Sequence, residues 1–94
     1  MTDSYQKLQE LMKFPNIVDF RIIVTKNESE PLLKIKEVID SIEENGMQEI
    51  TAAPRPSRNG NYISYTVPVK VTKADHLKKL SEKISVLAFV KHVL

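Results

Sequence analysis

The sequence predicts an α+β fold in which a four-stranded antiparallel sheet carries two helices on one face. Two segments, near residues 30–44 and 74–84, repeat apolar side chains with a helical period of about 3.6. The segments that flank them alternate apolar and polar residues, as strands with one buried face do. With 94 residues, of which 41% are hydrophobic, the chain has the length and composition of one globular domain.

The first fifteen residues are predicted to form a short helix and a connector. Asp3 is placed to accept backbone N–H bonds at the start of this helix, and apolar residues then recur at helical spacing. Pro15 ends it, because the residue before a proline is disfavoured in the α region. We therefore divide the chain into residues 1–15, the N-terminal helix and connector, and residues 16–94, a single domain.

Residues 17–25 are predicted as the first strand because their side chains alternate between two faces. The core face carries Val18, Phe20, Ile22 and Val24. The opposite face carries Ile17, Asp19, Arg21 and Ile23. That face is polar but keeps two apolar side chains, which is typical of a surface that meets a partner.

The first long helix is predicted to begin after Ser29, which we expect to be its N-cap, with Pro31 in the first turn. Its apolar stripe consists of Leu32, Ile35, Val38, Ile39 and Ile42. Asn45-Gly46 then provides a residue pair that tolerates the left-handed conformation at a helix end.

A hairpin is predicted to follow, with strands at residues 48–53 and 62–71. Asn59-Gly60 tolerates the positive φ angles of a tight turn between them. Pro68 lies within the second of these strands and has no N–H to donate. Its nitrogen should therefore face a place where the neighbouring strand has ended or bulged.

The second long helix and the last strand complete the chain. Thr72 resembles a cap, and Leu77, Leu80 and Ile84 form one helical stripe. Residues 87–94 are predicted as the last strand, although both of its faces are apolar enough to be buried. We favour the face with Phe89 over the face with Val90.

This order of elements is β-α-β-β-α-β, the split arrangement of ferredoxin-like folds. Its strands lie in the order 4-1-3-2, with both helices on one face. Two features of the sheet should then remain uncovered, namely the face opposite the helices and the edge formed by the last strand.

Composition excludes several classes of function. The chain has no cysteine, so disulfides, thiol catalysis and thiolate metal sites are absent. A net charge of +2 is too small to indicate nucleic-acid or anionic-membrane binding, and no apolar run approaches the ~20 residues of a membrane span. No aromatic side chain sits mid-strand on the open face of the central strands, where RNA bases would stack. We expect a cytoplasmic protein without a cofactor.

Three stretches resemble the YbeD-like family of small bacterial proteins of unknown function: Phe14-Pro15, residues 56–62 and the closing residues 90–94. The resemblance implies the same ferredoxin-like topology and a likeness to ACT-type regulatory domains, which bind small ligands in metabolic enzymes. It implies no established activity and no catalytic residues. The chain carries Arg58-Asn59 where the family more often has Ser and then Lys, which puts any role of a loop lysine in doubt.

The hairpin has the most unusual local chemistry. As a site for a small molecule or anion it would use Arg55, Ser57, Arg58, Gly60 and Asn61. Arginine guanidinium groups bind carboxylates and phosphates through paired donors. The alternative, which we favour, is a turn with two solvated arginines, because turn chemistry alone explains Pro, Asn and Gly here.

No catalytic constellation is recognisable. His76 and His92 are the only histidines, and no third ligand stands at metal spacing from either. We therefore expect a non-enzymatic, ACT-like regulatory or adaptor domain that acts as a homodimer or with a protein partner. The first strand's Ile17, Asp19, Arg21 and Ile23 are the expected interface. The alternative is a small-molecule or anion-binding module at the hairpin.

Overall fold

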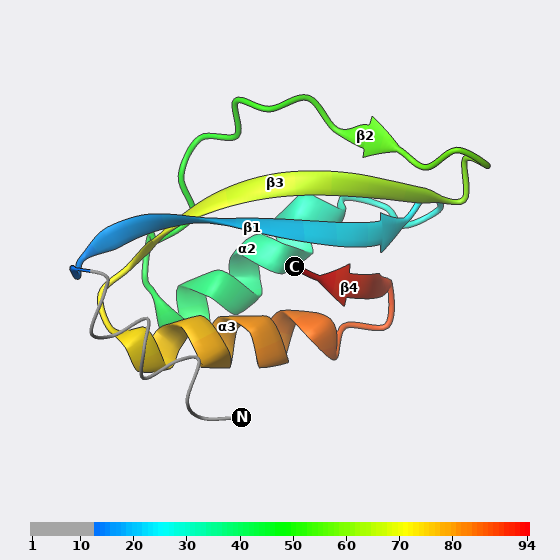
Figure 1. The fold of residues 1–94 in the computed structure, drawn as a ribbon. Helices are drawn as coiled ribbons and strands as arrows, with labels where there is room; N and C mark the ends of the chain where they lie inside the picture. Colours follow the sequence, from blue (N-terminus) through cyan, green and yellow to red (C-terminus); the bar gives the residue numbers. More distant parts are fainter. Residues whose placement is uncertain (1–12) are drawn as a thin grey trace.

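The computed structural model describes residues 13–94, which form one sheet and two helices (Figure 1). In chain order the elements are β1 (Asn16–Thr25), α2 (Pro31–Ile42), β2 (Arg55–Pro56), β3 (Tyr62–Val71), α3 (Ala74–Ser85) and β4 (Val90–Val93). The predicted N-terminal helix lies outside the described residues. The other elements follow in the predicted order.

The sheet has the order β2-β3-β1-β4, and every pair of neighbouring strands is antiparallel. Both helices cover the same face of this sheet (Figure 1). The predicted ferredoxin-like topology is therefore confirmed, with the two long strands β1 and β3 at the centre.

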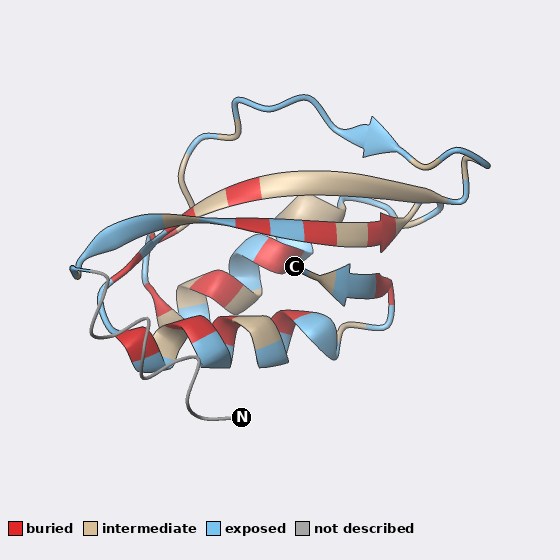
Figure 2. Ribbon diagram, in the orientation of Figure 1, coloured by how far each residue is buried: buried red, intermediate tan, exposed pale blue. Residues whose placement is uncertain are grey.

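The core lies between the sheet and the two helices, where Figure 2 shows the buried residues of both layers. Alternate residues of the central strands supply one side of it: Phe20, Ile22, Val24, Val67, Val69 and Val71. The helices supply Ile35, Ile39, Leu77, Leu80 and Ile84. These residues follow the predicted stripes, because burial of apolar surface selects the positions that share a face.

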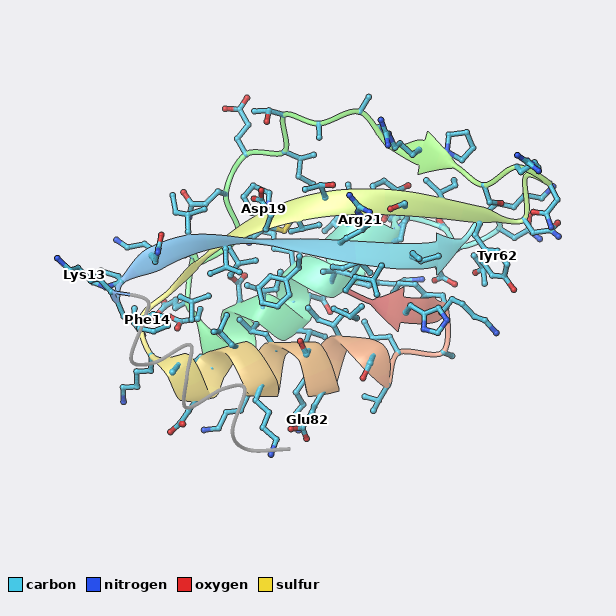
Figure 3. All side chains as sticks on the ribbon, viewed as in Figure 1. Lys13, Phe14, Asp19, Arg21, Tyr62 and Glu82 are labelled. Atoms are coloured by element: carbon cyan, nitrogen blue, oxygen red, sulfur yellow. The ribbon has the colours of Figure 1, made fainter. Side chains whose placement is uncertain are left out.

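The opposite face of the sheet carries the other residues of β1. Asp19 and Arg21 rise from β1 on the side away from the helices (Figure 3) and are exposed. Ile17 is 56% exposed and Ile23 is half-buried. No element within residues 13–94 packs over the centre of this face, which we call the open face.

Both predicted N-caps are wrong by one residue. The N-cap of α2 is Glu30, with φ 50°, and the N-cap of α3 is Lys73; neither makes a side-chain capping bond. Because Pro31 is the first residue of α2, Ser29 lies one position too early to cap the helix. The predicted stop after α2 is found at Asn45, which has φ 57°.

The predicted strand at residues 48–53 is also wrong. Met47 bridges Val69, and Gln48 N–H donates to the carbonyl of Pro68 at 2.8 Å. The next ladder bond would require an N–H at position 68, and proline has none. Pairing resumes only at Arg55, opposite Ser64.

We call residues 48–54 the arch, because they bow away from β3 between these two points (Figure 1). From Met47 to Arg55 the chain advances eight positions, whereas β3 advances five from Ser64 to Val69, so the arch carries three extra residues. The prediction that Pro68 faces an interruption of the neighbouring strand is confirmed.

The last strand is shorter than predicted and contains a bulge. Ile23 pairs with His92 but Val24 pairs with Val90, so Lys91 is an extra residue. A bulge shifts the alternation of side chains by one. Val90 and Val93, which pair with Val24 and Ile22, are therefore on the same side of the sheet, and Phe89 is buried in the turn before β4. Neither of the two predicted faces describes this strand.

Gly46 should not tolerate a side chain, because it joins the end of α2 to the edge of β3. A Cβ atom there would lie 2.7 Å from the Glu43 Cβ and 2.9 Å from the Glu43 carbonyl oxygen. We expect Gly46→Ala to lower the free energy of unfolding in urea by about 1–3 kcal/mol. Gly60→Ala is the control: its surroundings are open, so only its φ of 76° costs energy, about 1 kcal/mol. An equal or smaller loss for Gly46→Ala would contradict this packing.

Candidate functional site

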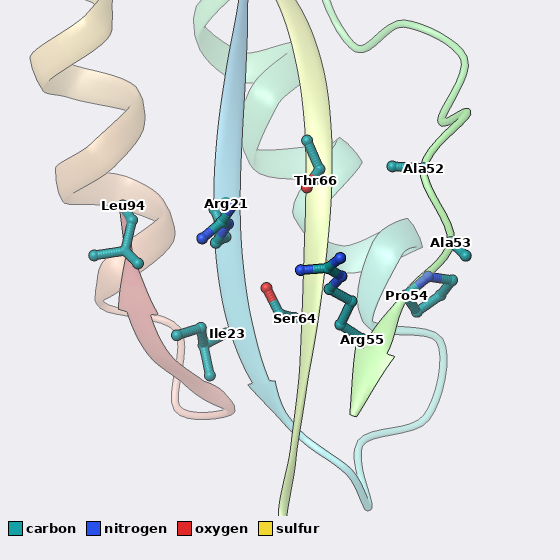
Figure 4. A pocket seen from close by; sticks show the side chains of 9 residues that line it. All are labelled: Arg21, Ile23, Ala52, Ala53, Pro54, Arg55, Ser64, Thr66 and Leu94. Carbon is teal, nitrogen blue, oxygen red and sulfur yellow. The ribbon is translucent and has the colours of Figure 1, made fainter. Parts of the chain in front are cut away.

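A groove of about 640 Å³ lies on the open face between the arch and the sheet. Figure 4 shows the residues that line it: Arg21, Ile23, Ala52, Ala53, Pro54, Arg55, Ser64, Thr66 and Leu94. They come from β1, β2, β3, the arch and the residue after β4. The groove is therefore formed only when the whole sheet is assembled.

Strand register places the two arginines on either side of β3. Arg21 lies opposite Thr66, and Arg55 lies opposite Ser64. Successive strands are about 4.8 Å apart, so the backbones of β1 and β2 are separated by roughly 10 Å. The small side chains of Ser64 and Thr66 form the floor between them and leave this space open.

The charged side chains that line the groove are both positive. The Arg55 side chain reaches from β2 across β3 towards Arg21 (Figure 4). None of the residues that line the groove is Asp or Glu. Neither arginine takes part in any of the ion pairs formed within residues 13–94. Two guanidinium groups that converge where the lining has no acidic side chain favour an anionic ligand.

Thr66 contributes main-chain groups to the same place. The N–H of Lys70 and the carbonyl of Pro68 both bond to the segment that leads into the arch. Main-chain groups of alternate strand residues point the same way, so those of Thr66 point under the arch. They make no backbone hydrogen bond to it among the described residues.

The hairpin residues predicted as a ligand site are divided between the groove and the turn. The Ser57 hydroxyl donates to the Asn59 side-chain oxygen at 2.9 Å and accepts from Tyr62 N–H at 3.0 Å. The N–H groups of Gly60 and Asn61 are also bonded within the turn. Of the two predicted arginines, only Arg55 lines the groove, and Arg58 is exposed in the turn.

The predicted interface residues share the open face but line different hollows. Arg21 and Ile23 belong to the groove. Ile17 lines a smaller hollow of about 450 Å³ together with Pro15, Asn16, Gln48 and Lys70. Asp19 lies between them, is exposed and lines neither.

Comparison with known proteins identifies the family. A family model described as a protein of unknown function (DUF493) matches residues 9–94. The chain belongs to this family. The resemblance to the YbeD-like proteins described above is thereby confirmed.

Relatives share nearly the whole chain. The chain is 31% identical over 88 residues to a UPF0250 protein of Yersinia pestis (strain Pestoides F), covering 94% of this chain and 97% of the relative. A UPF0250 protein of Yersinia pseudotuberculosis serotype I matches with the same identity and coverage. The solution structure of protein HP0495 from H. pylori has a TM-score of 0.67 at 21% identity, over 88% of this chain and 85% of that one. It shows the same fold.

A second polar cluster, which the sequence analysis missed, lies on the helical side of the sheet. Glu43 is only 6% exposed. Its carboxylate accepts hydrogen bonds from the Thr72 N–H at 2.7 Å, from the Thr72 hydroxyl at 3.0 Å and from the His76 ring at 2.5 Å. A carboxylate only accepts hydrogen bonds, so Nδ1 of His76 carries the proton.

These contacts determine the charge of Glu43. Burial by itself raises the pKa of its carboxyl group, but the hydrogen bonds from Thr72 and His76 outweigh burial and hold the pKa below its ordinary value. The carboxylate lies just before the first turn of α3, whose own N-cap residue, Lys73, makes no capping bond. Glu43 thus stabilises the N-terminus of α3 from a distant part of the chain.

One signal in the sequence points to Glu43. Ile35, Ile39 and Glu43 are spaced four residues apart, so the helical stripe continues into a carboxylate. Its partners, Thr72 and His76, lie about thirty residues further along, and no local pattern connects them to Glu43. Within residues 13–94, no three His, Asp or Glu side chains gather closely enough to hold a metal ion. Neither α2 nor α3 is long and apolar enough to cross a membrane.

Replacement of Glu43 should make the free energy of unfolding less dependent on pH in the acidic range. A carboxyl group with a lowered pKa stabilises the fold in full above its ordinary pKa of 4.5, and this contribution is lost as the pH falls through the lowered value. We expect Glu43→Gln to lower the free energy of unfolding by about 1–3 kcal/mol at pH 7. The difference from the wild-type protein should shrink below pH 4.

Urea unfolding across this pH range measures the effect. Glu44→Gln, at the exposed neighbouring position, is the control and should change stability little at any pH. A Glu43→Gln deficit that stays the same from pH 7 to pH 3 would contradict the role of the charged carboxylate.

Proposed function

We propose that the protein is a non-enzymatic, ACT-like regulatory or adaptor domain that acts by binding a protein, in the first instance a second copy of itself. The single observation that carries this proposal is the uncovered apolar surface of the open face. Ile17 is 56% exposed and Leu94, which lies opposite Arg21, is 69% exposed. Ile23, two positions beyond Arg21 on the same face, is half-buried. Exposed apolar side chains that share one sheet face favour burial against a partner.

The charges on the open face favour a second copy as that partner. Asp19 and Arg21 are two positions apart on β1, so they lie on the same face. In a twofold-symmetric pair each residue meets the counterpart surface of the other copy. Asp19 of one copy can then lie near Arg21 of the other, which offsets the charge of both.

The position of the histidines favours binding over catalysis. His76 is bonded to Glu43 on the helical side of the sheet, away from the groove. His92 pairs with Ile23 and is exposed on the open face. The lining of the groove offers arginine, serine and threonine as donors for recognition and contains no histidine or acidic side chain to act as a general base.

Self-association should depend on Ile17. We expect light scattering coupled to size exclusion to show a dimer at high micromolar concentration. Ile17→Lys should shift the protein to monomer, because it places a charge in the proposed interface. Leu33→Lys is the matched control: Leu33 is 54% exposed but lies on α2, on the far side of the sheet, so its variant should still dimerise.

Two results would contradict the proposal. If the wild-type protein stays monomeric up to high micromolar concentration, it does not self-associate as proposed. A dimer that survives Ile17→Lys would contradict an interface on the open face, and its loss in Leu33→Lys would place the interface on the helices instead.

A further inference from the structure

We propose that the groove beneath the arch binds a short aliphatic dicarboxylate, held between Arg21 and Arg55. This site differs from the hairpin site considered from the sequence, since it includes Arg55 but leaves out Arg58. It shares Arg21, Ile23 and Leu94 with the proposed interface but not Ile17, so the Ile17→Lys variant separates the two proposals.

Charge balance points to a ligand with two negative charges. Arg55 extends across β3 towards Arg21 (Figure 4), and the lining contains no acidic side chain to neutralise either of them. Each guanidinium can donate two parallel hydrogen bonds to one carboxylate. A dicarboxylate would offer one carboxylate group to each arginine. A monocarboxylate has only one such group for the two arginines.

The floor of the groove supplies neutral donors. The Ser64 hydroxyl lies between the two arginines (Figure 4). The Thr66 N–H points under the arch without a backbone partner among the described residues. A ligand carboxylate can therefore receive hydrogen bonds from below as well as from the guanidinium groups.

The remaining walls are apolar, which separates an organic acid from an inorganic anion. Ile23 and Leu94 line one side, and Ala52, Ala53 and Pro54 of the arch line the other. The methylene groups of a short aliphatic chain would be buried against these walls. Phosphate could occupy the space between the arginines but would leave the walls in contact with water.

The test is a titration of the ¹⁵N-labelled full chain, followed by backbone amide NMR. Glutarate is the probe, glutaramide is its neutral counterpart of the same shape, and inorganic phosphate is the anion without an apolar body. We expect saturable shifts at Arg21, Arg55 and Thr66 with glutarate, binding at least about tenfold weaker with phosphate, and none with glutaramide.

Three variants locate the site. Arg21→Gln and Arg55→Gln should each weaken glutarate binding at least about tenfold, because each loses charged hydrogen bonds. Arg58→Gln removes the same charge from the same hairpin outside the groove and should leave the affinity unchanged. Their amide spectra also show whether each variant keeps the fold.

The outcomes are distinct. Absence of saturable shifts with glutarate would overturn the proposal, and so would equal binding of phosphate or an effect of Arg58→Gln as large as that of Arg55→Gln. The titration is repeated with Ile17→Lys. Glutarate binding that persists in this monomeric variant supports the groove site whatever the outcome for self-association.

Discussion

The groove exists because β3 lacks one backbone N–H. Gln48 can donate to the carbonyl of Pro68, but Pro68 cannot donate in return, so the ladder on that side stops after a single bridge. On its other side β3 pairs with β1 along its full length. The missing donor therefore detaches only the arch, which carries three residues more than the stretch of β3 that it spans. The arch encloses the groove and leaves the outer edge of Thr66, in the groove floor, without a partner strand.

Burial on one side of the sheet determines which residues face that groove. The apolar residues of β1 and β3 pack against α2 and α3, and strand alternation then sends Arg21, Ser64 and Thr66 to the opposite face. Glu43 holds the start of α3 in place from the end of α2. The cluster around Glu43 and the groove thus lie on opposite sides of one sheet, the first stabilising the helical layer and the second available to a ligand.

Most of the fold could be predicted from the sequence, because it follows from local periodicity. The alternation in β1 and the stripe through Ile35 and Ile39 identify the core face without any knowledge of contacts. Apart from the two N-caps, the predictions that failed concern features that depend on contacts distant in the chain. The arch depends on Pro68, which follows it by more than a dozen residues, and the bulge at Lys91 depends on β1. Of the site, the open-face position of Arg21 and the presence of Arg55 were predictable, but their convergence required the strand order and register together.

Hydrogen exchange of the β3 backbone amides tests this account most directly. Tyr65 and Val67 flank Thr66 in the same strand, and their amides face β1. We predict slow exchange at these two positions and exchange at least about a hundredfold faster at Thr66, whose N–H faces the interrupted edge. Protection of Thr66 equal to that of Val67 would show that the outer segment pairs continuously with β3. The arch, and the groove beneath it, would then not exist.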